Sequence, residues 1–166
     1  EDHIFSKDLL AQSNSDKQLD TSTSSNKEYY KLIRCDRMNG SRMEPCALLF
    51  RLKRALITDL KGKILETIDY SDLYGATYLA GSPPKNASAS QKVKGEVYYL
   101  EIHQYKKVSK KGIFGGGKSQ RTLFQDTQLV FDTEGEAAAI RNLLLHISHD
   151  RDFWNKYPNI SLSSLK

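Results

Sequence analysis

The sequence predicts a mainly β domain of about seven strands, closed by one C-terminal amphipathic helix. Between residues 29 and 132, short runs of β-branched and aromatic residues alternate with Gly, Asn and Pro turn signals. The apolar residues then take a helical period over 133–147. Because every strand run precedes the helix, we expect antiparallel pairing in a meander and no βαβ crossovers. The length of 166 residues fits one domain.

The strand runs differ in how fully each is expected to be buried. The run 46–52 (CALLFRL) is apolar throughout, as in a buried strand, whereas 64–70 (ILETIDY) alternates apolar and polar residues, as in a half-buried strand. Gly turns at Asn39–Ser41 and Lys61–Lys63 predict hairpins. The strand runs are 29–38, 46–52, 54–60, 64–70, 73–80, 96–105 and 121–132.

The strand at 96–105 is the strongest of these runs. It should place Tyr98, Leu100 and Ile102 on one face of the sheet. Ahead of it, residues 81–91 contain two prolines and small polar residues, which is typical of an exposed loop.

The segments that flank the domain are polar. Residues 1–27 are expected to form a flexible N-terminal segment, because Ser, Thr, Asn and Asp dominate from residue 11 onward. The domain body is placed at 28–154, and 155–166 is interpreted as a C-terminal tail.

The helix at 133–147 has a clear start and one apolar stripe. Thr133 is an N-cap candidate, and Glu136 stands three residues later, as in a capping box. The stripe must cover an apolar surface, for which an open β-barrel is the natural partner. Its members are Ala137, Ile140, Leu143, Leu144 and Ile147.

The positive charge of the chain is local. The net charge is +5, and six cations gather within 106–121 without any acidic residue. Without these six, the rest of the chain has 19 basic and 20 acidic residues, so it is nearly neutral. A local positive patch indicates an anionic partner. The six are Lys106, Lys107, Lys110, Lys111, Lys118 and Arg121.

A second group of basic residues lies earlier, around the first two strand runs. Cations that converge at a loop mouth can grip phosphate groups, so these residues are ligand-binding candidates; a solvated strand face is the alternative. The tyrosines show no stacking platform of the kind that RNA-binding sheets use, and no nucleic-acid partner is expected. The candidates are Arg34, Arg37, Arg42, Arg51 and Lys53.

One motif has the appearance of a catalytic site. Residues 112–119 (GIFGGGKS) satisfy the P-loop pattern GxxxxGK[ST], and Asp132 ends an apolar run as a magnesium-binding Asp would. A P-loop needs a helix after it to hold the phosphates, whereas β-forming residues follow Ser119. We therefore interpret the motif as a false positive on a hairpin tip, and expect no enzyme activity.

Other reactive residues are sparse. Cys35 and Cys46 lie on neighbouring strand runs and are expected to be reduced thiols. His146 and His149 are spaced as a metal pair but have no third ligand at suitable spacing, so neither a metal nor a cofactor is predicted. Three sequons, Asn86 among them, are interpreted as chance matches, and a cytoplasmic location is the default.

This order of elements resembles the pleckstrin homology superfold, a seven-stranded antiparallel barrel or sandwich capped by a C-terminal amphipathic helix. The segment 129–147 (LVFDTEGEAAAIRNLLLHI) is the most specific piece of the resemblance. Many members carry a Trp inside the helix, whereas Trp154 follows it here. The family's basic pattern K-x(n)-[KR]-x-R is matched imperfectly by Arg42 and then Arg51-Leu52-Lys53.

A fainter similarity is to the domain that precedes the catalytic half of sphingosine- and ceramide-kinase-like lipid kinases. It rests on ILETIDYSDLYGATYL at 64–79 and VYYLEIHQYKK at 97–107. The GGDGT-like loop of those kinases does not occur in this sequence. The similarity therefore implies a regulatory or membrane-targeting piece without activity of its own.

The resemblances imply a non-catalytic module, monomeric as an isolated domain, that docks a larger protein onto anionic membrane containing phosphoinositides. A cytoplasmic protein in peripheral contact with membrane would fit this function. The alternative is a scaffolding domain that binds a peptide or a neighbouring protein domain.

Overall fold

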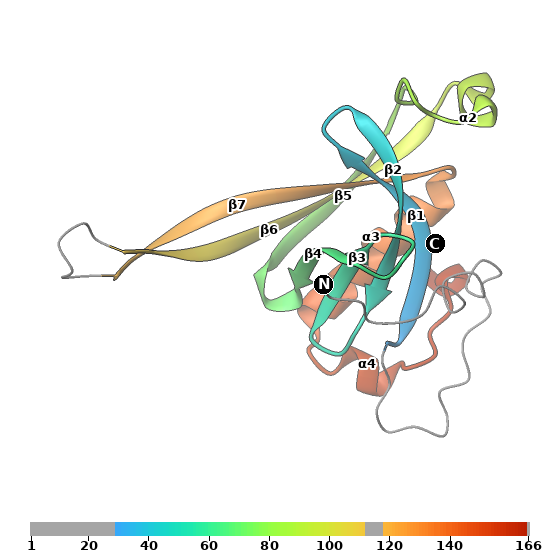
Figure 1. Cartoon of the computed structure of the whole chain (residues 1–166). Helices are drawn as coiled ribbons and strands as arrows, with labels where there is room; N and C mark the ends of the chain where they lie inside the picture. Colours follow the sequence, from blue (N-terminus) through green and yellow to red (C-terminus); the bar gives the residue numbers. More distant parts are fainter. Residues whose placement is uncertain (1–28, 112–117, 166) are drawn as a thin grey trace.

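The fold is a single seven-stranded antiparallel sheet with a helix packed against it (Figure 1). The computed structural model describes residues 29–111 and 118–165, and of residues 107–111 and 118–122 it describes the backbone alone. The predicted N-terminal segment 1–27 lies outside these residues. The strands are β1 (Lys31–Asn39), β2 (Arg42–Phe50), β3 (Arg54–Thr58), β4 (Ile64–Asp69), β5 (Leu73–Gly81), β6 (Val97–Lys111) and β7 (Lys118–Phe131).

The predicted fold class is confirmed, and the strand order is β4-β3-β2-β1-β7-β6-β5. Sequence neighbours pair within β1–β4 and again within β5–β7. Strand β1 joins these two halves, but only Asp36 and Arg37 pair with β7. The two halves therefore meet along a short seam, which lets them curve around a shared core.

The two predicted Gly turns form as expected. Gly40 has φ +63° in the turn between β1 and β2, a conformation that glycine adopts without steric penalty. Between β3 and β4, the Asp59 carboxylate accepts hydrogen bonds from the backbone N–H groups of Lys61 (2.8 Å) and Lys63 (2.9 Å). Such an Asx turn is the local preference of Asp, and it fixes this hairpin.

Helix α3 (Glu134–His149) covers the core, as the apolar stripe predicted. All five residues of the stripe are buried, and they pack with buried side chains of both halves of the sheet. From the sheet, Leu100 and Ile102 point into this core together with the half-buried Tyr98, which confirms the predicted face of that strand.

The C-terminal residues complete this packing. The short helix α4 (Phe153–Lys156) buries Trp154, and the 3-10 helix Leu162–Leu165 (η3) buries Leu165 beside α3. Asn142 of α3 donates a hydrogen bond to the Leu165 carbonyl. The segment that the sequence marked as a tail thus adds to the core.

The predicted loop 81–91 contains structure that the sequence did not indicate. Residues Ala89–Lys94 form the helix α2, with a full capping box between Ser88 and Gln91. The Asn86 side chain holds the backbone of Met43 through two hydrogen bonds (2.7 and 2.9 Å). Since the amide of Asn86 is engaged in this contact, its sequon has a structural role.

No helix among the described residues is long and apolar enough to cross a membrane.

Replacing Thr133 with alanine should lower the free energy of unfolding by about 1 kcal/mol. The Thr133 hydroxyl oxygen accepts from the Glu136 backbone N–H (3.2 Å), and the hydroxyl donates to Glu136 Oε1 (2.9 Å) in place of the second bond of a capping box. Urea unfolding followed by circular dichroism measures the loss. Thr133→Ser keeps the hydroxyl and should stay within about 0.5 kcal/mol of wild type; equal losses in both variants would contradict a capping role.

Candidate functional site

Strands β6 and β7 run on past the sheet as a two-stranded ribbon, the most prominent projection of the molecule (Figure 1). Strand β6 pairs with β5 only as far as Gln104, and β7 pairs with β1 only at Leu129 and Val130. From the pair Tyr105–Phe124 to the pair Lys111–Lys118, the two strands pair only with each other. We call residues 105–111 and 118–124 the ribbon.

The ribbon carries all six cations of the cluster that the sequence predicted. Lys106, Lys107, Lys110 and Lys111 lie on β6, and Lys118 and Arg121 lie on β7. No acidic residue occurs between positions 105 and 124. The structure thus places the predicted cationic cluster on an extended two-stranded arm.

Aromatic side chains gather where the ribbon leaves the sheet. Tyr74 of β5 stacks on Tyr105 (ring centroids 6.0 Å apart) and meets Phe124 edge-on (5.8 Å). Phe124 is 74% exposed and Tyr74 is 50% exposed. We call these three residues the aromatic cluster. The sequence alone does not reveal this cluster, because its members come from three strands.

The earlier basic group does not form one site. Strand β2 separates Arg42, at the β1–β2 turn, from Arg51 and Lys53, at the β2–β3 turn. Nine residues of extended chain span about 30 Å. Arg34 lies between these ends, opposite Ala47, and Arg37 lies opposite Glu44. The imperfect K-x(n)-[KR]-x-R match is therefore split between opposite ends of the hairpin.

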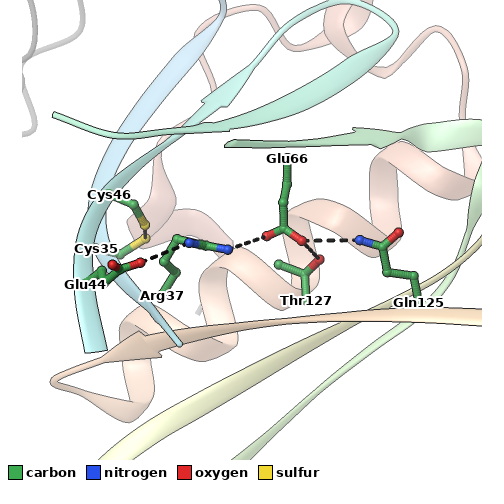
Figure 2. Close-up of polar contacts among 7 residues, drawn as sticks. All are labelled: Cys35, Arg37, Glu44, Cys46, Glu66, Gln125 and Thr127. Carbon is green, nitrogen blue, oxygen red and sulfur yellow. Dashed lines mark hydrogen bonds and ion pairs between the residues drawn. The ribbon is translucent and has the colours of Figure 1, made fainter. Parts of the chain in front are cut away.

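Arg37 forms ion pairs with two glutamates of the same domain (Figure 2). Its guanidinium contacts Glu44 Oε1 at 3.1 Å and Glu66 Oε2 at 3.6 Å. From β7, Gln125 Nε2 and the Thr127 hydroxyl each donate to Glu66 Oε1 at 3.3 Å. This network ties β4 to β7 across the two halves of the sheet, so it has a structural role.

The two cysteines face each other, as the sequence suggested. Cys35 and Cys46 are register partners on β1 and β2, and their sulfur atoms lie 3.6 Å apart as free thiols (Figure 2). The hydrogen bond with Cys46, together with burial, raises the pKa of the Cys35 thiol well above its ordinary value. Because the thiolate is the reactive form, the Cys35 thiol is unreactive at neutral pH.

The P-loop pattern has no helix behind it within the described chain. Residues 112–117 lie outside the described part, and strand β7 begins at Lys118. Asp132 follows the far end of β7, about 45 Å along the strand, and its Oδ1 accepts from Gln91 Nε2 (2.7 Å). Asp132 thus anchors α2 and lies far from the position that a magnesium-binding Asp would need.

The helix-end histidines, and the neighbouring carboxylates Asp69 and Asp72 before β5, have ordinary structural surroundings. His146 stacks on Phe153 with ring centroids 6.0 Å apart, and His149 is exposed in the last turn of α3. Asp69 forms an ion pair with Arg54 (3.4 Å), and Asp72 belongs to the 3-10 helix Tyr70–Asp72 (η2).

Among the described residues, the ribbon and its aromatic cluster are the best candidates for a binding surface. They combine positive charge with exposed apolar rings on one projecting element. Comparison with known proteins adds no assignment: no protein-family model, no curated protein and no solved structure matches this chain.

Proposed function

We propose that this chain is a non-catalytic binding module of the pleckstrin homology type, which docks a larger protein onto anionic membrane containing phosphoinositides. The strand order, with β1 between β2 and β7, and the helix after the last strand support the family resemblance. A fold of this kind serves several functions, so the function must be argued from the surface.

One observation carries the proposal: the ribbon holds six cations, no acidic residue, and exposed aromatic rings at its base. Each basic residue close to an anionic leaflet contributes about 1 kcal/mol of attraction. Aromatic rings such as Tyr74 and Phe124 favour the interface between lipid headgroups and acyl chains. Charge and rings together suit a peripheral, salt-sensitive contact.

In this proposal, the headgroups meet the ribbon and not the mouth of the β1–β2 hairpin. Arg42 is exposed at that mouth, but Arg37 is already paired with Glu44 and Glu66, and Arg51 and Lys53 lie at the other end of β2. A phosphate group could therefore reach only part of the earlier basic group at one time.

Two side-chain contacts join β5 to α3, the elements between which members of the superfold that this chain resembles bind peptides. Arg141 Nε donates to the Ala76 carbonyl (3.2 Å), and the Tyr78 hydroxyl donates to Glu134 Oε1 (3.3 Å). A peptide that added to this edge of β5 would have to displace them. These contacts favour the membrane over the peptide-binding alternative.

Vesicle sedimentation tests the proposal. The full chain should sediment with vesicles that contain phosphatidylserine or phosphatidylinositol bisphosphate and stay in solution with phosphatidylcholine alone. Replacing the six ribbon cations with glutamine should lower the bound fraction at least tenfold, because each removed charge takes away about 1 kcal/mol of attraction before screening. Comparing the two anionic lipids at equal surface charge separates phosphoinositide recognition from general attraction.

A charge-matched control keeps the test specific. Six exposed cations of the body, replaced in the same way, change the net charge equally and should leave most of the binding intact. Equal loss in both variants, or no binding of wild type at low salt, would contradict docking through the ribbon. The control residues are Lys61, Lys63, Lys85, Lys92, Arg151 and Lys156.

A further inference from the structure

Three metal-ligating side chains converge on one face of the β6–β7 pair, near the aromatic cluster. His103 of β6 and Asp126 of β7 are register partners, and Glu101 lies two residues before His103 on the same face. One ligand atom from each of the three lies within 4.8 Å of the others. We propose that Glu101, His103 and Asp126 bind Zn²⁺, independently of membrane docking.

The spacing is close to what a zinc ion needs. Tetrahedral Zn²⁺ holds imidazole nitrogen and carboxylate oxygen at about 2.0–2.2 Å, which places neighbouring ligand atoms about 3.3 Å apart. His103 Nδ1 and Asp126 Oδ1 lie 2.8 Å apart without an ion. The ion would take the place of the proton between His103 Nδ1 and Asp126 Oδ1, which would pass to solvent. The pair would widen by about half an ångström, and a small rotation would bring in the Glu101 carboxylate. A water molecule completes the fourth position.

Neighbouring side chains already hold His103 and Glu101 in place, as they do for the ligands of known metal sites. His103 Nε2 lies 3.1 Å from the Thr77 hydroxyl oxygen, so Nε2–H can donate there while Nδ1 faces the ion. Tyr74 stacks on the imidazole ring with centroids 5.8 Å apart. Gln128 Nε2 donates to Glu101 Oε1 at 3.5 Å. Outer partners of this kind fix the tautomer and the ring direction of metal-binding histidines.

The local charge also favours a cation. Within the part of the chain that the structure describes, neither Glu101 nor Asp126 forms an ion pair with Lys or Arg. Two carboxylates and one neutral imidazole would therefore leave two negative charges, which Zn²⁺ neutralises. Imidazole and carboxylate together suit Zn²⁺ better than Mg²⁺ or Ca²⁺, which prefer oxygen ligands alone.

The sequence predicted no metal site, and the reason is geometric. His146 and His149 stand three residues apart, the spacing at which a helix brings two ligands together. Asp126 lies 23 residues after His103 and reaches it only through the register of the β6–β7 hairpin.

Isothermal titration of the full chain with Zn²⁺ tests the site. We expect one ion per chain, with affinity at least tenfold lower in His103→Ala and in Asp126→Asn. His149→Ala removes an exposed histidine outside the cluster and should bind as wild type does. Zn²⁺ should also raise the melting temperature of the wild type, because binding to the folded state alone stabilises it.

Two outcomes would overturn the proposal. The first is the absence of saturable Zn²⁺ binding by the wild type. The second is binding that His103→Ala and Asp126→Asn retain, which would place the ion elsewhere, for instance on the cysteine pair. Asp126 is exposed, and asparagine has nearly the same shape, so this variant keeps the test valid if His103→Ala fails to fold.

Discussion

Replacing Trp154 with alanine is expected to lower the free energy of unfolding by about 3–5 kcal/mol. The side chain is 1% exposed, stacks on Tyr30 with ring centroids 5.0 Å apart, and contacts Phe50 (5.9 Å) and Phe153 (5.3 Å). Its removal opens a large cavity between β1, β2 and α4, which the surrounding strands cannot fill. Because Trp154 is the one tryptophan of the chain, unfolding in urea should be followed by far-ultraviolet circular dichroism.

Tyr157 offers a matched control on the same segment. Its ring meets Phe153 at 5.3 Å but is 52% exposed, so Tyr157→Ala should cost less than about 1 kcal/mol. A loss below 1 kcal/mol in Trp154→Ala as well would show that α4 does not contribute to the core.

The second large effect is expected at Arg37. Replacing it with alanine leaves the half-buried Glu66 carboxylate without its cation, and we expect the free energy of unfolding to fall by about 2–3 kcal/mol at neutral pH. This range lies below that of fully buried pairs, because the side chains of Arg37 and Glu66 keep 16% and 18% exposure and solvent screens them in part. Urea unfolding midpoints measure the change.

The exposed ion pair Arg54–Asp69 is the control for that experiment. Its side chains are 53% and 44% exposed, so Arg54→Ala should change stability by less than about 1 kcal/mol. Removing both partners, as Arg37→Met with Glu66→Leu, should recover much of the loss, because no unpaired charge then remains buried. If Arg37→Ala were no worse than Arg54→Ala, the network would not couple the two halves of the sheet.

What the sequence predicts well here is local. The helical stripe from Ala137 to Ile147 and the alternation around Leu100 follow from the periods of a helix and a strand, and Thr133 marks the start of the helix through a side chain that bonds only nearby backbone. Each of these signals depends on residues within about one turn or one hairpin of each other.

What the sequence could not predict depends on contacts between distant segments. Glu66 meets Thr127 from 61 positions away, and Tyr74 meets Phe124 from a different strand pair. Arg42 and Arg51 lie at opposite ends of β2, because this strand begins at Arg42. The sequence predicted a later start, at position 46, because proline at position 45 is unfavourable within a strand. Helix α2 has only six residues, too few for a recognisable apolar period.

The length of the ribbon has a consequence for the distance between the domain and any surface that the ribbon touches. From Gln104 to Lys111, seven residues of extended chain reach about 23 Å beyond the sheet. At physiological ionic strength, electrostatic attraction fades over about 8 Å. A surface held only at the end of the ribbon would therefore scarcely sense the charges of the body and would not touch the rings at the ribbon's base. A contact that uses both the cations and the rings requires the ribbon to lie along the surface.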